Sequence, residues 1–196
     1  MNIQISVAFV ILVITVGLSL AGLYGSPKII ERNLFRPYYL LRRKQYDTVI
    51  TSGFVHADLM HLIFNMLTFY FFAFGLERWI GSVRFALLYL VGLLVSHAGT
   101  YYKQKNNPEY ASLGASGAIS AVLFAAIVYN PDQSLFIIPI PVPIPAPLFA
   151  LGYLAYSWYA SKNPHGRINH DAHLGGAVAG LLFVALTDFD AYRRLI

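Results

Sequence analysis

The sequence predicts an all-α, polytopic membrane protein with six transmembrane helices. Of its 196 residues, 57% are hydrophobic and 12% are charged, which is about half the charged fraction of a typical soluble domain. The mean hydropathy is +0.57, and uncharged runs approaching the roughly 20 residues that cross a bilayer recur along the chain. Because this length suits one domain, we expect a single integral membrane domain over residues 1–196.

The apolar runs place the six expected spans. Residues 5–23 form 19 consecutive uncharged residues. The chain start lacks the basic residues and the cleavage pattern of a signal peptide, so we expect this first helix to be retained. Arg84 is the one charged residue between residues 80 and 102. The expected spans cover residues 5–25, 57–77, 80–102, 114–130, 147–160 and 172–188.

Two connections between these spans have unusual compositions. Residues 26–56 mix charged, aromatic and aliphatic side chains, as interfacial segments do, so we expect a long, partly embedded first loop. Residues 138–147 read IPIPVPIPAP, in which every second residue lacks a backbone donor. We therefore expect extended backbone there, leading into a helix from about Pro147.

The charge and the cysteine content limit the binding partners and the kinds of reactive site that we expect, and the charge distribution predicts a membrane orientation. The net charge of +5 comes from basic residues scattered through the loops, which fits contact with anionic headgroups of the lipid bilayer and not with nucleic acid. The sequence has no cysteine, which excludes disulfides, thiolate nucleophiles and cysteine–metal sites. The first loop holds six basic residues, so the positive-inside rule places it in the cytoplasm and both termini outside.

The order of the spans brings four polar residues to one side of the membrane. With six spans, the second, fourth and sixth run in the same direction, so their N-terminal ends share one face. His61 and Asn65 stand at the start of the second span, Ser116 at the start of the fourth, and His173 at the start of the sixth. Polar residues within membrane spans are costly and mark functional sites by default.

These residue types support acyl transfer. A serine hydroxyl becomes a nucleophile when a base within hydrogen-bond reach takes its proton, and histidine is the usual base. His61 and Asn65 are spaced i, i+4 and share one helix face, where both can donate to an oxyanion. Taken alone, a serine here is more often an N-cap; the conjunction on one face carries the prediction.

Small residues predict close packing of the spans that carry Ser116 and His173. Gly176 and Gly180 form a GxxxG pattern in the sixth span, and Gly117 begins a stripe of small residues in the fourth. Such stripes let helix backbones approach closely. Gly114 and Gly117 flank Ser116 and allow a tight entry into its span.

Three motifs together resemble the rhomboid family of intramembrane serine proteases. They are HADLMHLIFN at residues 56–65, GASG at residues 114–117 and AHLGGAVAG at residues 172–180. The resemblance covers about residues 45–190 and implies a rhomboid-like bundle of six helices. It implies a serine endopeptidase that uses no cofactor and no metal. Its substrates would be membrane proteins, cut within or next to a transmembrane segment.

The resemblance also assigns roles to individual residues. Ser116 would be the nucleophile and His173 the general base, in a dyad without a carboxylate. The backbone amide of Ser116 and the side chains of His61 and Asn65 would form the oxyanion hole. The fifth span and the loop before His173 would form a gate. His56 would pin a loop, and Glu77 would tether one by hydrogen bonds.

The resemblance has further implications and some departures. It implies a multi-pass protein with its active site open to the outer face, against the charge distribution, and the short chain suits the cytoplasmic membrane of a bacterium. Asp47 and Thr48 stand where the family often has Trp-Arg. Ser120 stands where many members have an aromatic residue packed on the catalytic histidine. We therefore expect another aromatic residue or a hydrogen bond to orient His173.

Two other functions compete with proteolysis. One is a non-cleaving rhomboid-like protein that binds membrane clients, whose sign would be loss of the nucleophile or base; both residues are present. The other is a metal-dependent membrane hydrolase, although the sequence has no HExxH motif. The residues that the metal-dependent hydrolase would use are His56, His61, His170, Asp171 and His173.

Within the serine protease interpretation, Asp171 is a candidate third member of a catalytic triad. The favoured alternative is that Asp171 is a solvated loop residue.

Overall fold

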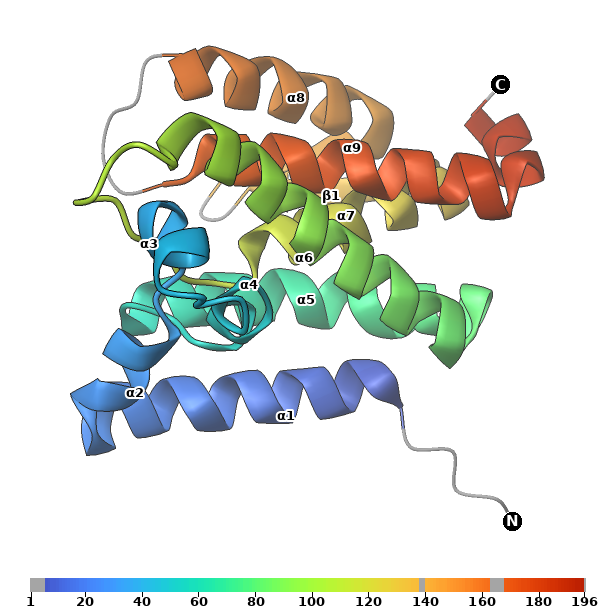
Figure 1. Cartoon of the computed structure of the whole chain (residues 1–196). Helices are drawn as coiled ribbons and strands as arrows, with labels where there is room; N and C mark the ends of the chain where they lie inside the picture. Colours follow the sequence, from blue (N-terminus) through green and yellow to red (C-terminus); the bar gives the residue numbers. More distant parts are fainter. Residues whose placement is uncertain (1–5, 138–139, 163–167, 196) are drawn as a thin grey trace.

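The computed structural model describes residues 6–137, 140–162 and 168–195. In this part of the chain, six long helices form a bundle (Figure 1), which confirms the expected all-α fold class. The first helix ends in a π-helical turn, η1 (Ala21–Gly25). The six helices are α1 (Val7–Leu20), α5 (Leu59–Ile80), α6 (Ser82–Gln104), α7 (Ser116–Tyr129), α8 (Ala146–Lys162) and α9 (His170–Thr187).

Among the described residues, four helical segments are long and apolar enough to cross a membrane. They are α1 together with η1, α5, α6 and α9. The helix α7 is equally apolar but has only 14 residues, about 21 Å at 1.5 Å per residue, which is less than the roughly 30 Å hydrocarbon core. The chain is therefore a multi-pass membrane protein whose short helix α7 begins or ends below the level of its longer neighbours.

The helix α7 is the centre of the bundle. Every residue from Gly117 to Tyr129 is buried, and the helix packs against α5, α6, α8 and α9. A helix that is apolar on all sides belongs in such a position. The outer helices instead expose large apolar side chains, such as Phe71 and Leu186, as a surface in contact with lipid does. The core of the protein is thus built around the helix that begins at Ser116.

The N-terminus of α1 is held by Glu77 on α5. The carboxylate accepts hydrogen bonds from the backbone amides of Val7 and Ala8 at 2.7 and 3.0 Å, and from the hydroxyl of Ser82 at 2.6 Å. A carboxylate at a helix N-terminus satisfies amides that lack an intrahelical partner. Glu77 therefore joins the ends of α1, α5 and α6. The contact expected from the sequence was with a loop instead.

The long first loop is folded into short helices and is fastened by its own side chains. The carboxylate of Asp47 forms an ion pair with Arg32 at 2.6 Å, and the hydroxyl of Thr48 donates to the Gln45 carbonyl at 2.7 Å. These two residues stand at the positions expected for Trp-Arg, and they secure the loop by different contacts. The short helices are α2 (Pro27–Asn33), α3 (Pro37–Arg42), α4 (Thr48–Thr51) and the 3-10 turn η2 (Ser52–Phe54).

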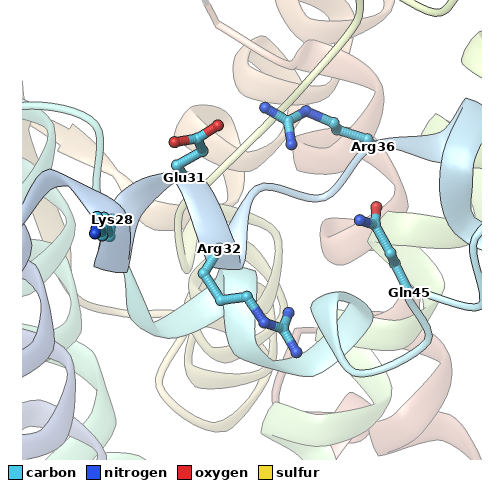
Figure 2. A pocket seen from close by; sticks show the side chains of 5 residues that line it. All are labelled: Lys28, Glu31, Arg32, Arg36 and Gln45. Carbon is cyan, nitrogen blue, oxygen red and sulfur yellow. The ribbon is translucent and has the colours of Figure 1, made fainter.

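The same loop carries a hollow lined mostly by polar and basic side chains (Figure 2). Its volume is about 300 Å³. Deeper in the loop, Phe35 is buried, meets the His97 ring edge-on at 4.4 Å, and pairs through its backbone with Ser112. This contact fastens the loop to the segment that leads into α7. The residues lining the hollow are Lys28, Glu31, Arg32, Arg36 and Gln45.

The described part of the proline-rich segment before α8, residues 140–145, is extended, as predicted, and it also forms a strand that was not predicted; residues 138–139 of the segment lie outside the described residues. The strand β2 (Ile140–Pro145) pairs antiparallel with β1 (Ser134–Ile137), and α8 follows it directly from Ala146. A proline alternating with another residue can keep ladder bonds through the residues between. After α9, the chain ends in a 3-10 segment, η3 (Phe189–Leu195).

Candidate active site

The helices α5, α7 and α9 all begin at the same end of the bundle, and their first turns carry the predicted polar residues. Ser116 is the first residue of α7, and His173 lies in the first turn of α9. Figure 1 shows α5 and α9 running in the same direction, and α7 packs against both of them. The first amides of a helix lack an intrahelical acceptor, so the backbone N–H of Ser116 is available to a ligand.

Glycine contacts bring α7 and α9 into backbone contact. A β-carbon added at Gly176 would overlap the backbone carbonyl of Gly117, and one added at Gly117 would lie 3.3 Å from the Ala172 carbonyl oxygen. One turn further along, Gly180 meets Ala121 in the same way. This geometry sets the first turns of α7 and α9 against each other. Among the described residues, no hydrogen bond joins the side chains of Ser116 and His173.

The His61 ring lies against the loop that leads into Ser116. Gly114 has a φ of +116°, a conformation that favours glycine. A β-carbon added there would lie 2.6 Å from Cε1 and 2.9 Å from Nε2 of His61. Asn65, one turn along α5, donates to the His61 carbonyl at 2.9 Å, which leaves its second amide hydrogen free. The His61 ring therefore stands beside the segment that positions Ser116, and Asn65 follows it one turn along α5.

His56 is a buried neighbour of the His61 ring. Its ring is fully buried and meets the His61 ring edge-on at 4.9 Å. The hydroxyl of Ser19, on α1, lies 3.1 Å from Nδ1 of His56 and forms a hydrogen bond with it, and the same hydroxyl lies 3.4 Å from the Phe54 carbonyl oxygen. Burial lowers the pKa of His56 to about 3, with repulsion from His61 adding to the effect and Asp58 opposing it. His56 is thus neutral and links α1 to the site.

A residue that sequence reasoning missed completes the surroundings of His173. The ring of Tyr153, on α8, stacks on the His173 ring with centroids 6.3 Å apart and planes 21° apart. The Tyr153 hydroxyl lies 3.0 Å from the hydroxyl of Ser120. The sequence signal was the absence of an aromatic side chain at Ser120, which required one from elsewhere. Nothing in the sequence distinguished Tyr153 from the other aromatic residues of α8.

A small polar cavity lies beside Ser116. Its volume of about 20 Å³ exceeds the roughly 10–15 Å³ that one water molecule needs on this measure. Hydroxyl and amide groups line it, so a water there would find hydrogen-bond partners. Its lining includes Ser96, Thr100, Ser116, Gly117 and Asn169.

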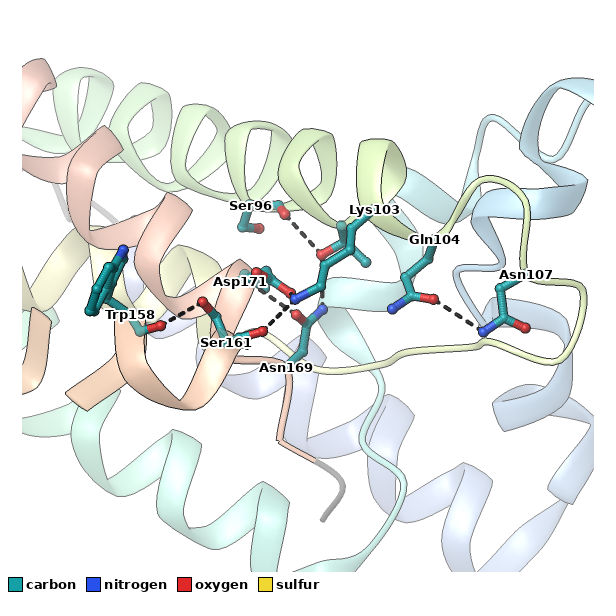
Figure 3. A network of polar contacts seen from close by, with 10 residues as sticks. Ser96, Lys103, Gln104, Asn107, Trp158, Ser161, Asn169 and Asp171 are labelled. Atoms are coloured by element: carbon teal, nitrogen blue, oxygen red, sulfur yellow. Dashed lines mark hydrogen bonds and ion pairs between the residues drawn. The ribbon is translucent and has the colours of Figure 1, made fainter. Parts of the chain in front are cut away.

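Asp171 does not contact the predicted base in the way a triad member would. Its carboxylate forms an ion pair with Lys103 of α6 at 2.8 Å, and Lys103 also donates to the Ser161 carbonyl near the end of α8 at 2.5 Å. Figure 3 shows this network, in which Asn169 caps α9 and accepts from the Ala172 amide at 3.1 Å. Asp171 thus fastens α6 to the N-terminus of α9, and its side chain is not simply solvated.

The candidate metal ligands do not converge. In the described ranges, no group of three or more histidine or acidic side chains is placed to hold a metal ion. His170 packs edge-on between Tyr156 and His173, with centroids 5.4 and 5.9 Å away. The arrangement therefore gives no geometric support to a metal-dependent hydrolase built from His56, His61, His170, Asp171 and His173.

Comparison with known proteins places the fold in a family. The profile described as Rhomboid domain matches residues 43–188. The chain is 31% identical over 154 residues to "Putative rhomboid protease YdcA" of Bacillus subtilis, covering 74% of this chain and 69% of that protein. It is 29% identical over 179 residues to Rhomboid protein 1, mitochondrial, of Saccharomyces cerevisiae, covering 86% of this chain and 50% of that one.

A human relative widens the comparison. The chain is 32% identical over 144 residues to the human presenilin-associated rhomboid-like protein, mitochondrial, covering 69% of this chain and 36% of that protein. It thus spans half or less of the length of these two mitochondrial relatives. The profile match extends over most of the chain and includes all three motifs. The chain therefore belongs to the rhomboid family.

Proposed function

We propose that the protein is an intramembrane serine endopeptidase in which Ser116 is the nucleophile and His173 the general base. The observation that carries the proposal is the backbone contact between α7 and α9 at Gly117 and Gly176, which sets the two side chains on facing first turns. A hydrogen bond that is absent in the free enzyme is compatible with this role, because such bonds often tighten when substrate binds.

The chemistry follows from the groups around Ser116. His173 takes the hydroxyl proton as Ser116 Oγ attacks the peptide carbonyl, and it then returns the proton to the leaving amine. The oxyanion accepts hydrogen bonds from the Ser116 backbone amide, the His61 ring and the free amide hydrogen of Asn65. A water, for which the adjacent cavity has room, hydrolyses the acyl-enzyme with His173 again acting as base.

The substrates we propose are membrane proteins with a transmembrane segment. The helix α7 is about 6 Å shorter than α9, from 14 and 18 residues at 1.5 Å each, and every residue of it after Ser116 is buried in the bundle. A nucleophile at this position reaches peptide bonds that lie in or beside the membrane. The surrounding exposed apolar surface supports contact with a lipid-embedded chain.

A fluorophosphonate probe tests the reactive serine directly. Labelling of the wild type that is lost in Ser116→Ala and His173→Ala supports the proposal, with Ser120→Ala retaining labelling as evidence that the reactive hydroxyl is Ser116. A folded wild type that binds a membrane client yet takes no label would instead support the client-binding alternative.

We also propose that the active site opens to the outer face of a bacterial cytoplasmic membrane. The first loop and the starts of α7 and α9 lie at the same end of the bundle as the proposed active site. One accessibility measurement therefore shows on which side of the membrane all of them lie. Because the sequence has no cysteine, Asn106→Cys on the site side and Asp190→Cys on the opposite side can each be labelled without background. Labelling of Asn106→Cys alone by a membrane-impermeant maleimide in intact cells is the expected result. Labelling of Asp190→Cys alone would place the site in the cytoplasm, as the charge distribution predicts.

A further inference from the structure

The ring of His173 is oriented by aromatic packing. The backbone amide of His173 donates to the Asn169 carbonyl at 3.2 Å, but within the described ranges its ring forms no hydrogen bond. Its ring neighbours are Tyr153, stacked at 6.3 Å, and His170, edge-on at 5.9 Å. His170 lies on the same helix as His173, so Tyr153 is the ring partner that another helix supplies.

Tyr153 is itself held by contacts with α7. The Ser120 hydroxyl donates its one hydrogen to the Ser116 carbonyl at 2.9 Å, so Ser120 Oγ must accept the bond from the Tyr153 hydroxyl. The ring of Phe124, also on α7, lies 5.4 Å from the Tyr153 ring. A continuous set of contacts therefore runs from the carbonyl of Ser116, through Ser120 and Tyr153, to the ring of His173.

The helix that carries Tyr153 lies at the edge of the bundle. Figure 1 shows α8 outside α9, and the buried residues of α8 are Ala146, Ser157 and Ala160. Leu151, just before Tyr153, is 67% exposed. Thus the aromatic partner of the His173 ring belongs to a helix with few buried residues.

We propose that Tyr153 is the positioning residue of His173, so that the dyad is aligned while α8 packs against α7 and α9 and loses its alignment when α8 moves away. The inference rests on the proposed function and adds a dependence of the base on a peripheral helix. A substrate segment that displaces α8 would have to let Tyr153 return before the base is aligned.

Kinetics separate this role from substrate contact. Tyr153→Leu removes the ring and should lower kcat roughly five- to tenfold, the equivalent of one aromatic pair, with KM little changed. Tyr153→Phe keeps the ring and should retain most of the activity. Leu151→Ala is the control on the exposed face of the same helix. Fluorophosphonate labelling should slow by the same factor as kcat, because this small probe needs no transmembrane segment to bind. An increase in KM with normal labelling would make Tyr153 a substrate contact and overturn the inference.

A transfer of the ring tests the dependence on α8. The double variant Ser120→Tyr/Tyr153→Ala moves the phenol onto α7 at nearly constant volume, and it should recover activity relative to Tyr153→Ala. Recovery supports the inference, and a folded double variant no better than Tyr153→Ala opposes it. Should the double variant not fold, the single substitutions still decide the question.

Nuclear magnetic resonance of histidine-labelled protein reads the contact without any turnover. A stacked phenol shifts the His173 ring protons upfield, so Tyr153→Leu should move their signal downfield, with His173→Gln providing the assignment. If the wild type cleaves the reporter and takes the probe, but Tyr153→Leu changes neither kcat nor the His173 signal, the inference is overturned while the proposed function stands. A wild type that neither cleaves nor labels overturns the proposed function, and with it the catalytic part of this inference, even when the signal moves.

Discussion

Gly176 of α9 lies directly against the backbone carbonyl of Gly117 on α7, with no room for a β-carbon between them. The contact is backbone to backbone, so neither helix can relieve an added methyl group by rotating a side chain. It occurs one residue after Ser116 and three residues after His173. The distance between the proposed nucleophile and base is therefore set by the absence of a side chain at Gly176.

The substitution Gly176→Ala should consequently separate the dyad. Overpacking of this kind costs about 1–3 kcal/mol of stability, and a displacement near 1 Å can reduce the catalytic rate about a hundredfold. Gly75→Ala is the matched control, because a β-carbon there meets nothing within 4 Å. Thermal unfolding in detergent and cleavage of a reporter substrate measure the two effects. Equal activity of the two variants would show that this contact does not position the dyad.

Gly114→Ala should impair the oxyanion hole. Both Gly114 and Gly81 have positive φ angles, +116° and +80°, so alanine at either position costs about 1–2 kcal/mol of backbone strain. At Gly114 the new methyl group also meets the His61 ring, whereas at Gly81 it meets nothing within 4 Å. We expect the larger loss in Tm for Gly114→Ala, which adds the contact with His61 to the backbone strain, and a fall in kcat for Gly114→Ala alone. A comparable fall for Gly81→Ala would assign the effect to strain.

The burial of His56 predicts a pH-dependent stability. Its pKa falls from 6.5 to about 3 on folding, so below pH 6.5 the unfolded chain takes up a proton that the folded protein does not. The stability from neutral His56 is therefore fully present above pH 6.5 and is lost progressively as the pH falls toward 3. The Tm difference between wild type and His56→Gln should shrink from pH 7.5 to 4. Parallel curves would mean that His56 is not buried in its neutral form.

Asp171 and Lys103 should behave as a structural pair. They form a partly exposed ion pair, which contributes about 0–1 kcal/mol. Asp171→Asn and Lys103→Met should therefore cause similar small losses in Tm and change kcat less than about threefold. A large fall in kcat for Asp171→Asn, with Lys103→Met near normal, would restore Asp171 as a third member of the catalytic group.

The sequence was most informative where a physical requirement fixes the residue type. An apolar run in a membrane must form a helix to satisfy its backbone, so each of the six uncharged runs contains a helix, although within the part of the chain that the structure describes only four of these helical segments are long enough to cross the hydrocarbon core. The parity of the spans placed Ser116 and His173 at the same end of the bundle. The GxxxG pattern identified the contact at Gly176 because only glycine permits it.

Other features depend on tertiary contacts that no local pattern encodes. Tyr153 is one of several aromatic residues in an uncharged segment, and its contact with His173 depends on the rotation of α8 about its axis. Asp171 is two residues before His173, yet its partner is Lys103, more than sixty positions away in the chain. The pairing of β1 with the proline-rich strand likewise depends on the fold of the whole connection.

Cleavage of a single-span reporter in proteoliposomes tests the central claim most directly, with products mapped by mass spectrometry. The account predicts that wild type cuts one bond in or beside the transmembrane segment, and that Ser116→Ala and His173→Ala each lose at least about a thousandfold in rate while keeping the wild-type Tm within a few degrees. Cleavage at the same bond by folded Ser116→Ala or His173→Ala, at an undiminished rate, would contradict it.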